Sequence, residues 1–207
     1  VLIFDESGFV KKGKDSVGVE RQYCGGIGKV ENCQVGVFAA YASRHGYCFL
    51  ENRLFVPEKW FGEEYAKRRE KCKLPKEISF RTKPQLGAEM FEEIVREKVI
   101  PFRYVVVDTV YGSSPEFIDA VEKTAGVTYL VSLPLDTLCW TQEPAILEKT
   151  YRYGGEERKK LVLATATLKP ITFEKLAKGT NDYFWYRRKV SEGTKGPVTY
   201  EFMKKRV

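Results

Sequence analysis

Two short apolar segments that each end on an aspartate constrain this chain more than any other feature of its sequence. Residues 1–5 read Val-Leu-Ile-Phe-Asp, and residues 104–108 read Tyr-Val-Val-Val-Asp. Such runs predict strands, and an acidic residue that closes a strand lies at the edge of the sheet. A single aspartate there most often only starts a turn, because its side chain bonds the backbone that follows. Two aspartates on neighbouring strands are able to share a divalent metal ion, so Asp5 and Asp108 are candidate metal ligands.

The other strand and helix signals come in an order typical of an α/β fold. We expect three antiparallel strands with short connections, followed by helices that alternate with two further strands. A Gly- and Lys-rich loop is expected over residues 8–28. The other elements expected before residue 135 are strands over 33–42, 47–55 and 128–133, a helical stretch from Pro57 through Cys72, a helix that Thr82 caps and that carries Leu86, Met90, Phe91, Ile94 and Val95 at helical spacing, and a helix that starts at Ser114 and Pro115 and stops at Gly126.

From residue 135 onward the pattern changes to apolar or alternating stretches separated by glycines. This pattern is typical of strands joined by turns. The stretches cover residues 161–168, 183–190 and 198–203. We therefore expect a core over residues 1–134 and a β-rich region over residues 135–207.

Dense short motifs surround both aspartates. Asp5 opens the segment Asp-Glu-Ser-Gly-Phe, and Lys-Lys-Gly follows at residues 11–13. Asp108 is followed by Thr-Val-Tyr-Gly, which places a tyrosine and a glycine three and four residues after the acid. Further motifs are Ser16-Val17-Gly18-Val19, Arg21-Gln22-Tyr23, Gly28-Lys29-Val30, Asn32-Cys33-Gln34-Val35 and Gly193-Thr194-Lys195-Gly196-Pro197-Val198.

These motifs resemble those of bacterial insertion-sequence DDE transposases, in the group that carries a β-rich insertion before its final catalytic glutamate. The resemblance implies an α/β fold with a ribonuclease H-like mixed sheet, in which the first and fourth strands are parallel neighbours and Asp5 lies beside Asp108. It implies that the two aspartates are the first two acids of the catalytic triad and hold Mg²⁺ or Mn²⁺ in a two-metal site. The implied activity is metal-dependent DNA strand cleavage and strand transfer at transposon ends.

No residue of this chain matches the third acid of that family. The family places its glutamate on a helix after the insertion, in a setting like Tyr-x-x-Arg-x-x-x-Glu. Tyr41 and Tyr65 have an arginine at the right spacing, but both come too early, and a cysteine stands where the glutamate belongs. We therefore expect the third acid beyond the end of the chain, an incomplete catalytic core over residues 1–134, and little activity from this piece alone. A first residue inside a strand also suggests a fragment of a longer protein.

Basic residues suggest contacts with double-stranded DNA, both transposon ends and target. Lys and Arg number 35 against 28 Asp and Glu, which gives a formal charge of +7 and favours a polyanionic partner. Glycines in the first loop let the backbone approach phosphates, although a solvated hairpin connection explains the same composition. A tryptophan beside cations is able to stack on an unpaired base, although alternating aromatic residues in a strand usually form core. The candidate DNA-binding residues are Lys11, Lys12, Lys14, Arg21, Lys29, Trp185, Arg187 and Arg188, with Trp140 as a second candidate for stacking.

Several questions stay open from the sequence. If the first strand continues, Glu6 points away from Asp5, and a ligand role and a solvated or orienting role are equally compatible with its position. The five cysteines are scattered without a Cys-x-x-Cys pair, which argues against zinc. We expect a bacterial cytoplasmic, nucleoid-associated protein without membrane contact, and a homodimer is possible for the full-length protein. Other interpretations are a ribonuclease H-like nuclease unrelated to transposition and a non-catalytic, transposase-derived DNA-binding protein.

Overall fold

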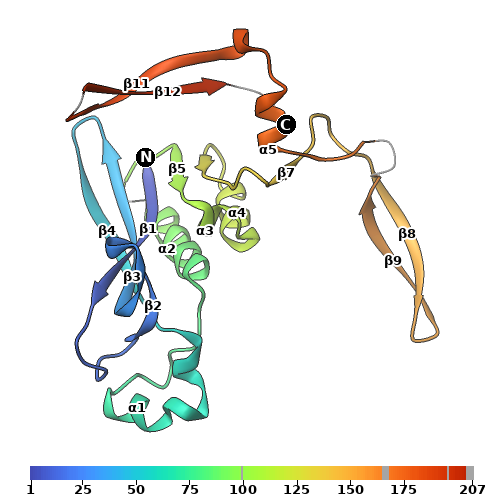
Figure 1. Ribbon diagram of the computed structural model, residues 1–207. Coiled ribbons are helices and arrows are strands. Elements are labelled where there is room, and N and C mark those ends of the chain that lie inside the picture. The colour runs from blue at the N-terminus through green and yellow to red at the C-terminus, as the bar shows by residue number, and fades with distance from the viewer. Residues whose placement is uncertain (99, 165–167, 195, 204–207) are drawn as a thin grey trace. The chain divides into compact units, whose positions relative to one another are not determined.

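The computed structural model describes residues 1–98, 100–164, 168–194 and 196–203 (Figure 1). The chain divides into two compact units, Val1–Leu133 and Pro134–Val207. Throughout the described stretches, every helix is too short or too polar to cross a lipid bilayer.

The first unit is built on a six-stranded mixed sheet within residues 1–98 and 100–133 (Figure 1). The strand order is β2-β3-β1-β5-β6, and β4 also pairs with β3. The pairs β1–β3, β2–β3 and β3–β4 are antiparallel, whereas β1–β5 and β5–β6 are parallel. The prediction of an α/β fold with a mixed sheet is therefore confirmed. The strands are β1 (Leu2–Val10), β2 (Glu20–Cys24), β3 (Lys29–Ser43), β4 (Gly46–Phe55), β5 (Tyr104–Val107) and β6 (Thr128–Val131).

The first strand is longer than the sequence predicted. β1 continues past Asp5 to Val10, and the expected loop over residues 8–28 contains the end of β1, the strand β2 and the short 3-10 helix η1 (Gly25–Ile27). The prediction that the strand ends at Asp5 was wrong because β3 is long enough to pair with β1 as far as Val10. Gly8 lies within this pairing rather than in a turn. A larger residue would not fit at this position, because its Cβ would lie 2.6 Å from the sulfur of Cys24.

Helices cover one face of this sheet and form the core. The helix α2 (Lys83–Glu97) begins as predicted, with a capping box in which the Thr82 hydroxyl accepts from the Gln85 backbone N–H and the Gln85 side chain accepts from the Thr82 N–H. The helix α4 (Pro115–Glu122) begins as predicted but ends at Glu122, before the expected stop at Gly126. Between β5 and α4 lies a one-turn helix, α3 (Thr109–Gly112), which the sequence did not predict. The buried core residues are Leu2, Phe4, Val37, Ala39, Leu86, Met90, Phe91, Ile94, Val105, Val107, Tyr111, Phe117, Ala120 and Val121.

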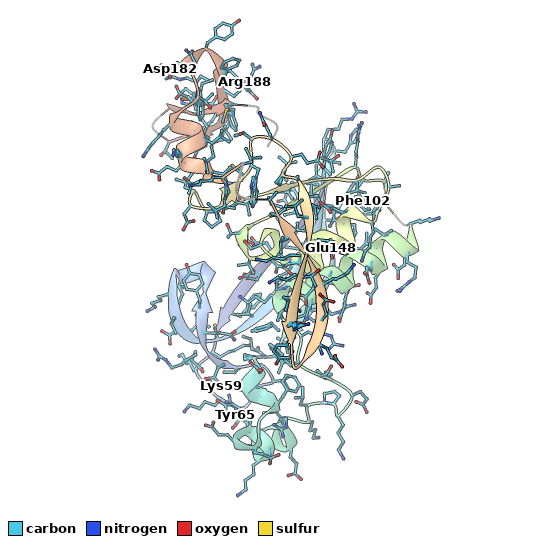
Figure 2. All side chains as sticks on the ribbon, turned by 90° about the vertical axis from the view of Figure 1, so that its right-hand side faces the viewer. Lys59, Tyr65, Phe102, Glu148, Asp182 and Arg188 are labelled. Atoms are coloured by element: carbon cyan, nitrogen blue, oxygen red, sulfur yellow. The ribbon has the colours of Figure 1, made fainter. Side chains whose placement is uncertain are left out.

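The helical stretch expected from Pro57 through Cys72 is broken into short pieces. Gly62 adopts an extended conformation and separates the 3-10 helix η2 (Glu58–Phe61) from the 3-10 helix η3 (Glu63–Tyr65) and the helix α1 (Ala66–Lys71). Lys59 on η2 and Tyr65 on η3 are labelled in Figure 2. Trp60 anchors this segment, because it is fully buried and donates its indole N–H to the Val19 carbonyl over 3.2 Å.

The second unit consists of three two-stranded sheets and short helical segments within residues 134–164, 168–194 and 196–203. The strand expected over 161–168 ends at Leu163, and residues 165–167 lie outside the described residues. A glycine turn joins this strand, β9, to the preceding strand β8, which the sequence did not predict. The apolar pattern of β8 is weak because every residue of the two strands except Val162 is exposed, so neither strand has a core face. The elements are β7 (Leu138–Cys139) paired with β10 (Ile171–Thr172), β8 (Ile146–Tyr153) paired with β9 (Glu156–Leu163), β11 (Trp185–Gly193) paired with β12 (Gly196–Met203), α5 (Phe173–Lys178) and the 3-10 helix η4 (Asp182–Phe184).

Candidate metal centre

Asp5 lies in β1 beside Asp108, the residue that directly follows the adjacent parallel strand β5. The register pairs Phe4 of β1 with Val107 of β5, so the next residue of each segment is one of the two aspartates. One carboxylate oxygen of each lies, together with one of Glu6, in a group whose members are all within 4.8 Å of one another. The structure thus brings together the two aspartates that the sequence singled out, although Asp5 lies within its strand.

Backbone donors fix one oxygen of each aspartate and leave the other one open. Asp5 Oδ1 accepts from the Glu6 backbone N–H over 2.8 Å. Asp108 is the N-cap of α3, and its Oδ1 accepts from the backbone N–H groups of Val110 and Tyr111 over 2.9 and 3.5 Å. Among the described residues, no hydrogen bond reaches Oδ2 of either aspartate. Capping and cation binding are therefore compatible at Asp108, since they use different oxygens.

Glu6 is the third acid of this group, and it is held from two sides. Its Oε1 accepts from the Lys83 ammonium over 2.8 Å, and the two side chains are only 18% and 20% exposed. Its Oε2 is buried, as is the hydroxyl of Tyr111, and neither atom has a hydrogen-bond partner among the described residues. The sequence pattern gave no reason to connect Lys83 with this site, because it marks Lys83 only as the first residue of a capped helix.

The donor set fits a hard divalent cation. Carboxylate oxygens are the ligands that Mg²⁺ and Mn²⁺ prefer. Two ligand oxygens on opposite sides of Mg²⁺ lie about 4.2 Å apart, since each Mg–O distance is about 2.1 Å. The 4.8 Å limit on the separations among Asp5, Glu6 and Asp108 is close to this span, so small side-chain rotations bring the three oxygens around one ion.

Negative charge is concentrated at this edge of the sheet. Burial raises the pKa of Asp5, and the carboxylates of Glu6 and Asp108 raise it further, against the lowering effects of the Glu6 backbone N–H and of Lys83. Burial likewise raises the pKa of Tyr111 far above its usual range, and the Glu6 carboxylate is the next largest cause. A positive charge placed here would lower the pKa of both Asp5 and Tyr111.

The Tyr-Gly pair after Asp108 holds α3 in place. Tyr111 is fully buried and packs edge-to-face on Phe117, with ring centroids 5.6 Å apart. A Cβ at Gly112 would lie 2.8 Å from the Cβ of Val131 on β6, so any larger residue would push the short helix away from the sheet. Both residues thus fix the helix whose N-terminus Asp108 caps.

The candidate DNA-binding residues of the first unit lie on or beside the β2–β3 hairpin. The loop after β1 is held by Asn32, whose side-chain amide donates to the carbonyls of Lys11 and Gly13 over 2.6 and 3.0 Å, and Arg68 donates to the Lys14 carbonyl. Lys11 is half-buried, and Lys12, Lys14, Arg21 and Lys29 are exposed. Arg21 pairs with Asn32 across the hairpin, so it lies near Lys11, whereas Lys29 lies at the far end of the hairpin.

In the second unit, the candidate residues follow one another along β11. Trp185 is half-buried, and Arg187 and Arg188 are exposed. Arg187 forms an ion pair with Glu201 over 3.0 Å, whereas the Arg188 guanidinium, labelled in Figure 2, lies 5.4 Å from the Tyr186 ring centre. Neighbouring strand residues point to opposite faces, so the structure does not bring the two arginines together.

The geometry defines an acidic site at the junction of an antiparallel and a parallel part of one mixed sheet. Comparison with known proteins agrees with this class of site: the profile of the DDE superfamily endonucleases matches residues 1–197. The chain therefore belongs to the DDE superfamily endonuclease family.

A curated relative and the solved structures complete the comparison. The chain is 31% identical over 133 residues, 64% of its own length, to the "Probable transposase for insertion sequence element IS701" of Microchaete diplosiphon. The match spans 31% of the length of that relative. No solved structure gave a significant match.

Proposed function

We propose that this chain carries the first two acids of a DNA transposase that cleaves and joins strands at transposon ends. The observation that supports this proposal best is the convergence of Asp5 and Asp108 at one edge of the sheet in a member of the DDE superfamily endonucleases. These two residues would hold Mg²⁺ or Mn²⁺. When bound, such ions polarise the phosphate and stabilise the negative charge that develops during phosphoryl transfer.

The strand order supports a ribonuclease H-like core. Three antiparallel strands, β4, β3 and β1, continue into the parallel strands β5 and β6, and α2 precedes β5. We propose that this core covers residues 1–134 and that residues 135–207 form the β-rich insertion of the family. The third acid of the triad would lie outside the chain, because no glutamate here has the Tyr and Arg spacing of the family motif.

Double-stranded DNA is the proposed substrate. Lys12, Lys14 and Arg21 are exposed on or beside a loop that Asn32 and Arg68 fix, so these cations are presented on an ordered backbone, and Lys29 is exposed at the far end of the β2–β3 hairpin. Ordered cations contact phosphates without reading sequence. For the second unit, we propose that Trp185, Arg187 and Arg188 contact the DNA of the transposon end.

The test is cleavage by a longer form of the protein that includes the final glutamate of the family. Asp5→Asn and Asp108→Asn should each abolish Mn²⁺-dependent cleavage of a transposon-end duplex and leave DNA binding nearly unchanged. Asp119→Asn, at an exposed position of α4, is the matched control and should cut normally. Cleavage retained by either active-site variant would refute the assignment, and metal-independent DNA retention without any cleavage by the parent would favour a non-catalytic DNA-binding protein.

A further inference from the structure

Glu6 has contacts that the first two acids of a DDE site do not explain. We propose that Glu6 is a third ligand of a divalent-cation site carried by the first unit, and that Lys83 is an internal counter-ion that a divalent cation replaces on Glu6. This inference rests on the proposed function of Asp5 and Asp108 and adds a ligand to it.

The position of Glu6 in β1 directs it toward the core side of the sheet. Leu2 and Phe4 alternate with it along the strand, and both are buried against the helices. A carboxylate on this side has little access to water, and its side chain is 18% exposed. Even so, one of its oxygens is within 4.8 Å of the oxygens of Asp5 and Asp108. Glu6 therefore reaches the same point as the aspartates from the opposite face of the strand.

The charges of this group match a divalent ion. Asp5, Glu6 and Asp108 together carry three negative charges, and Lys83, at the first turn of α2, supplies one positive charge. Two negative charges are left, which one divalent cation neutralises. The Lys83 ammonium contacts only Oε1 of Glu6 among the described acids, so it occupies one oxygen of one ligand and leaves the aspartates open.

Two orphaned polar atoms give independent support. Tyr111 is fully buried and its hydroxyl faces Glu6, whose carboxylate raises the pKa of the tyrosine both by its charge and by hydrogen bonding, yet neither this hydroxyl nor Glu6 Oε2 has a partner in good hydrogen-bond geometry in the described chain. Buried polar groups without partners are rare in native proteins, and a bound ion is one of their common explanations.

The effect of removing Lys83 on cation affinity distinguishes two roles of the Lys83–Glu6 pair. The pair either only supports the fold, or consists of a metal ligand and its internal counter-ion. If the pair only supports the fold, removing either partner weakens cation binding. If Lys83 competes with the cation for Glu6, removing its charge strengthens cation binding, because unlike charges attract and the competing charge is gone.

The test is Mn²⁺ binding to the 207-residue chain at pH 7.5, measured by calorimetry and by the loss of the free Mn²⁺ signal in electron paramagnetic resonance. We expect one ion per wild-type chain. Glu6→Gln should weaken the affinity at least about tenfold, as loss of a group that holds or orients a metal does. Lys83→Met should tighten the affinity by roughly threefold or more, since the positive charge that competes with the cation for the Glu6 carboxylate is removed. Glu93→Gln is the matched control, because Glu93 is also a half-buried acid in an ion pair, with Arg53, and should bind Mn²⁺ as wild type does.

The outcomes separate this inference from the proposed function. Unchanged affinity in Glu6→Gln, weaker binding in Lys83→Met, or no binding by the wild-type chain would overturn the role of Glu6. If Asp5→Asn and Asp108→Asn lose Mn²⁺ while Glu6→Gln keeps it, the proposed function stands and only the third ligand is rejected. If both aspartate variants bind Mn²⁺ as wild type does, the proposed function is rejected as well. Circular dichroism spectra of each variant show whether it is folded.

Discussion

The Lys83–Glu6 ion pair should contribute measurably to the stability of the metal-free protein. Removing one partner of a fully buried pair costs about 3–5 kcal/mol, whereas an exposed pair contributes about 0–1 kcal/mol. This pair lies between these limits, because its atoms are 2.8 Å apart and its side chains are 18% and 20% exposed. We therefore expect Lys83→Met to lower the free energy of unfolding by about 2 kcal/mol in the presence of a chelator.

Urea unfolding is the assay, with the fluorescence of Trp60 as the signal. Trp60 is fully buried in the first unit, and Trp140 and Trp185 would be replaced by phenylalanine in every variant so that only this unit is observed. A double-mutant cycle with Glu6→Gln should give a coupling energy of about 1–2 kcal/mol. A coupling energy below about 0.5 kcal/mol would refute the reasoning, since the two residues would then act independently. Saturating Mn²⁺ should reduce the stability deficit of Lys83→Met, because a ligand that binds the folded state more tightly stabilises it more.

Three further changes test other parts of the structure. Thr82→Ala removes the capping box of α2 and should lower the free energy of unfolding by about 1 kcal/mol in urea, whereas an unchanged value would contradict the cap. Asp5→Asn should stabilise the metal-free protein at pH 7, because the pKa of Asp5 is raised in the folded state. The stability linked to the Asp5 proton is fully present below the unfolded-state pKa and is lost as the pH rises through the folded-state pKa. The neutral asparagine does not suffer this loss. The gain should therefore vanish in acid, and a gain independent of pH would contradict the raised pKa. Asn32→Ala releases the loop that carries Lys12 and should weaken binding of duplex DNA severalfold in fluorescence anisotropy, with Asn52→Ala as control; equal affinities would show that loop order does not matter.

The sequence predicted those features that depend on local pattern. Apolar spacing and the Thr82 cap were enough to find α2, whereas the order of strands and helices placed the Asp5 and Asp108 segments side by side only together with the resemblance to the transposase family. The helix prediction depends on signals that lie within a few residues of each other, and the strand prediction depends on rules of chain connection and on the family motifs.

Contacts between distant segments were outside the reach of such reasoning. The continuation of β1 to Val10 depends on how far β3 extends alongside it, and the approach of Lys83 to Glu6 joins residues 77 positions apart. Alternation suggested that Glu6 points away from Asp5, which holds for the two faces of the strand, but the pattern gave no way to see that the carboxylates still meet at the edge. The Tyr-Gly pair was recognised as a motif, whereas its reason, the close approach of Gly112 to Val131, is a property of the packed unit.

The place of β1 between β3 and β5 has a consequence for the order of folding. Its pairing with β3 closes a loop of a few tens of residues, whereas its pairing with β5 must join residues about 100 positions apart, as in the match of Leu2 with Val105. Contacts of long sequence separation form late, because the entropy of the intervening chain opposes them until the rest is organised. We therefore expect the hairpins of β1 to β4 to be in place first, and the acidic group to assemble only when β5 docks, so cation affinity would report the completion of folding rather than any intermediate.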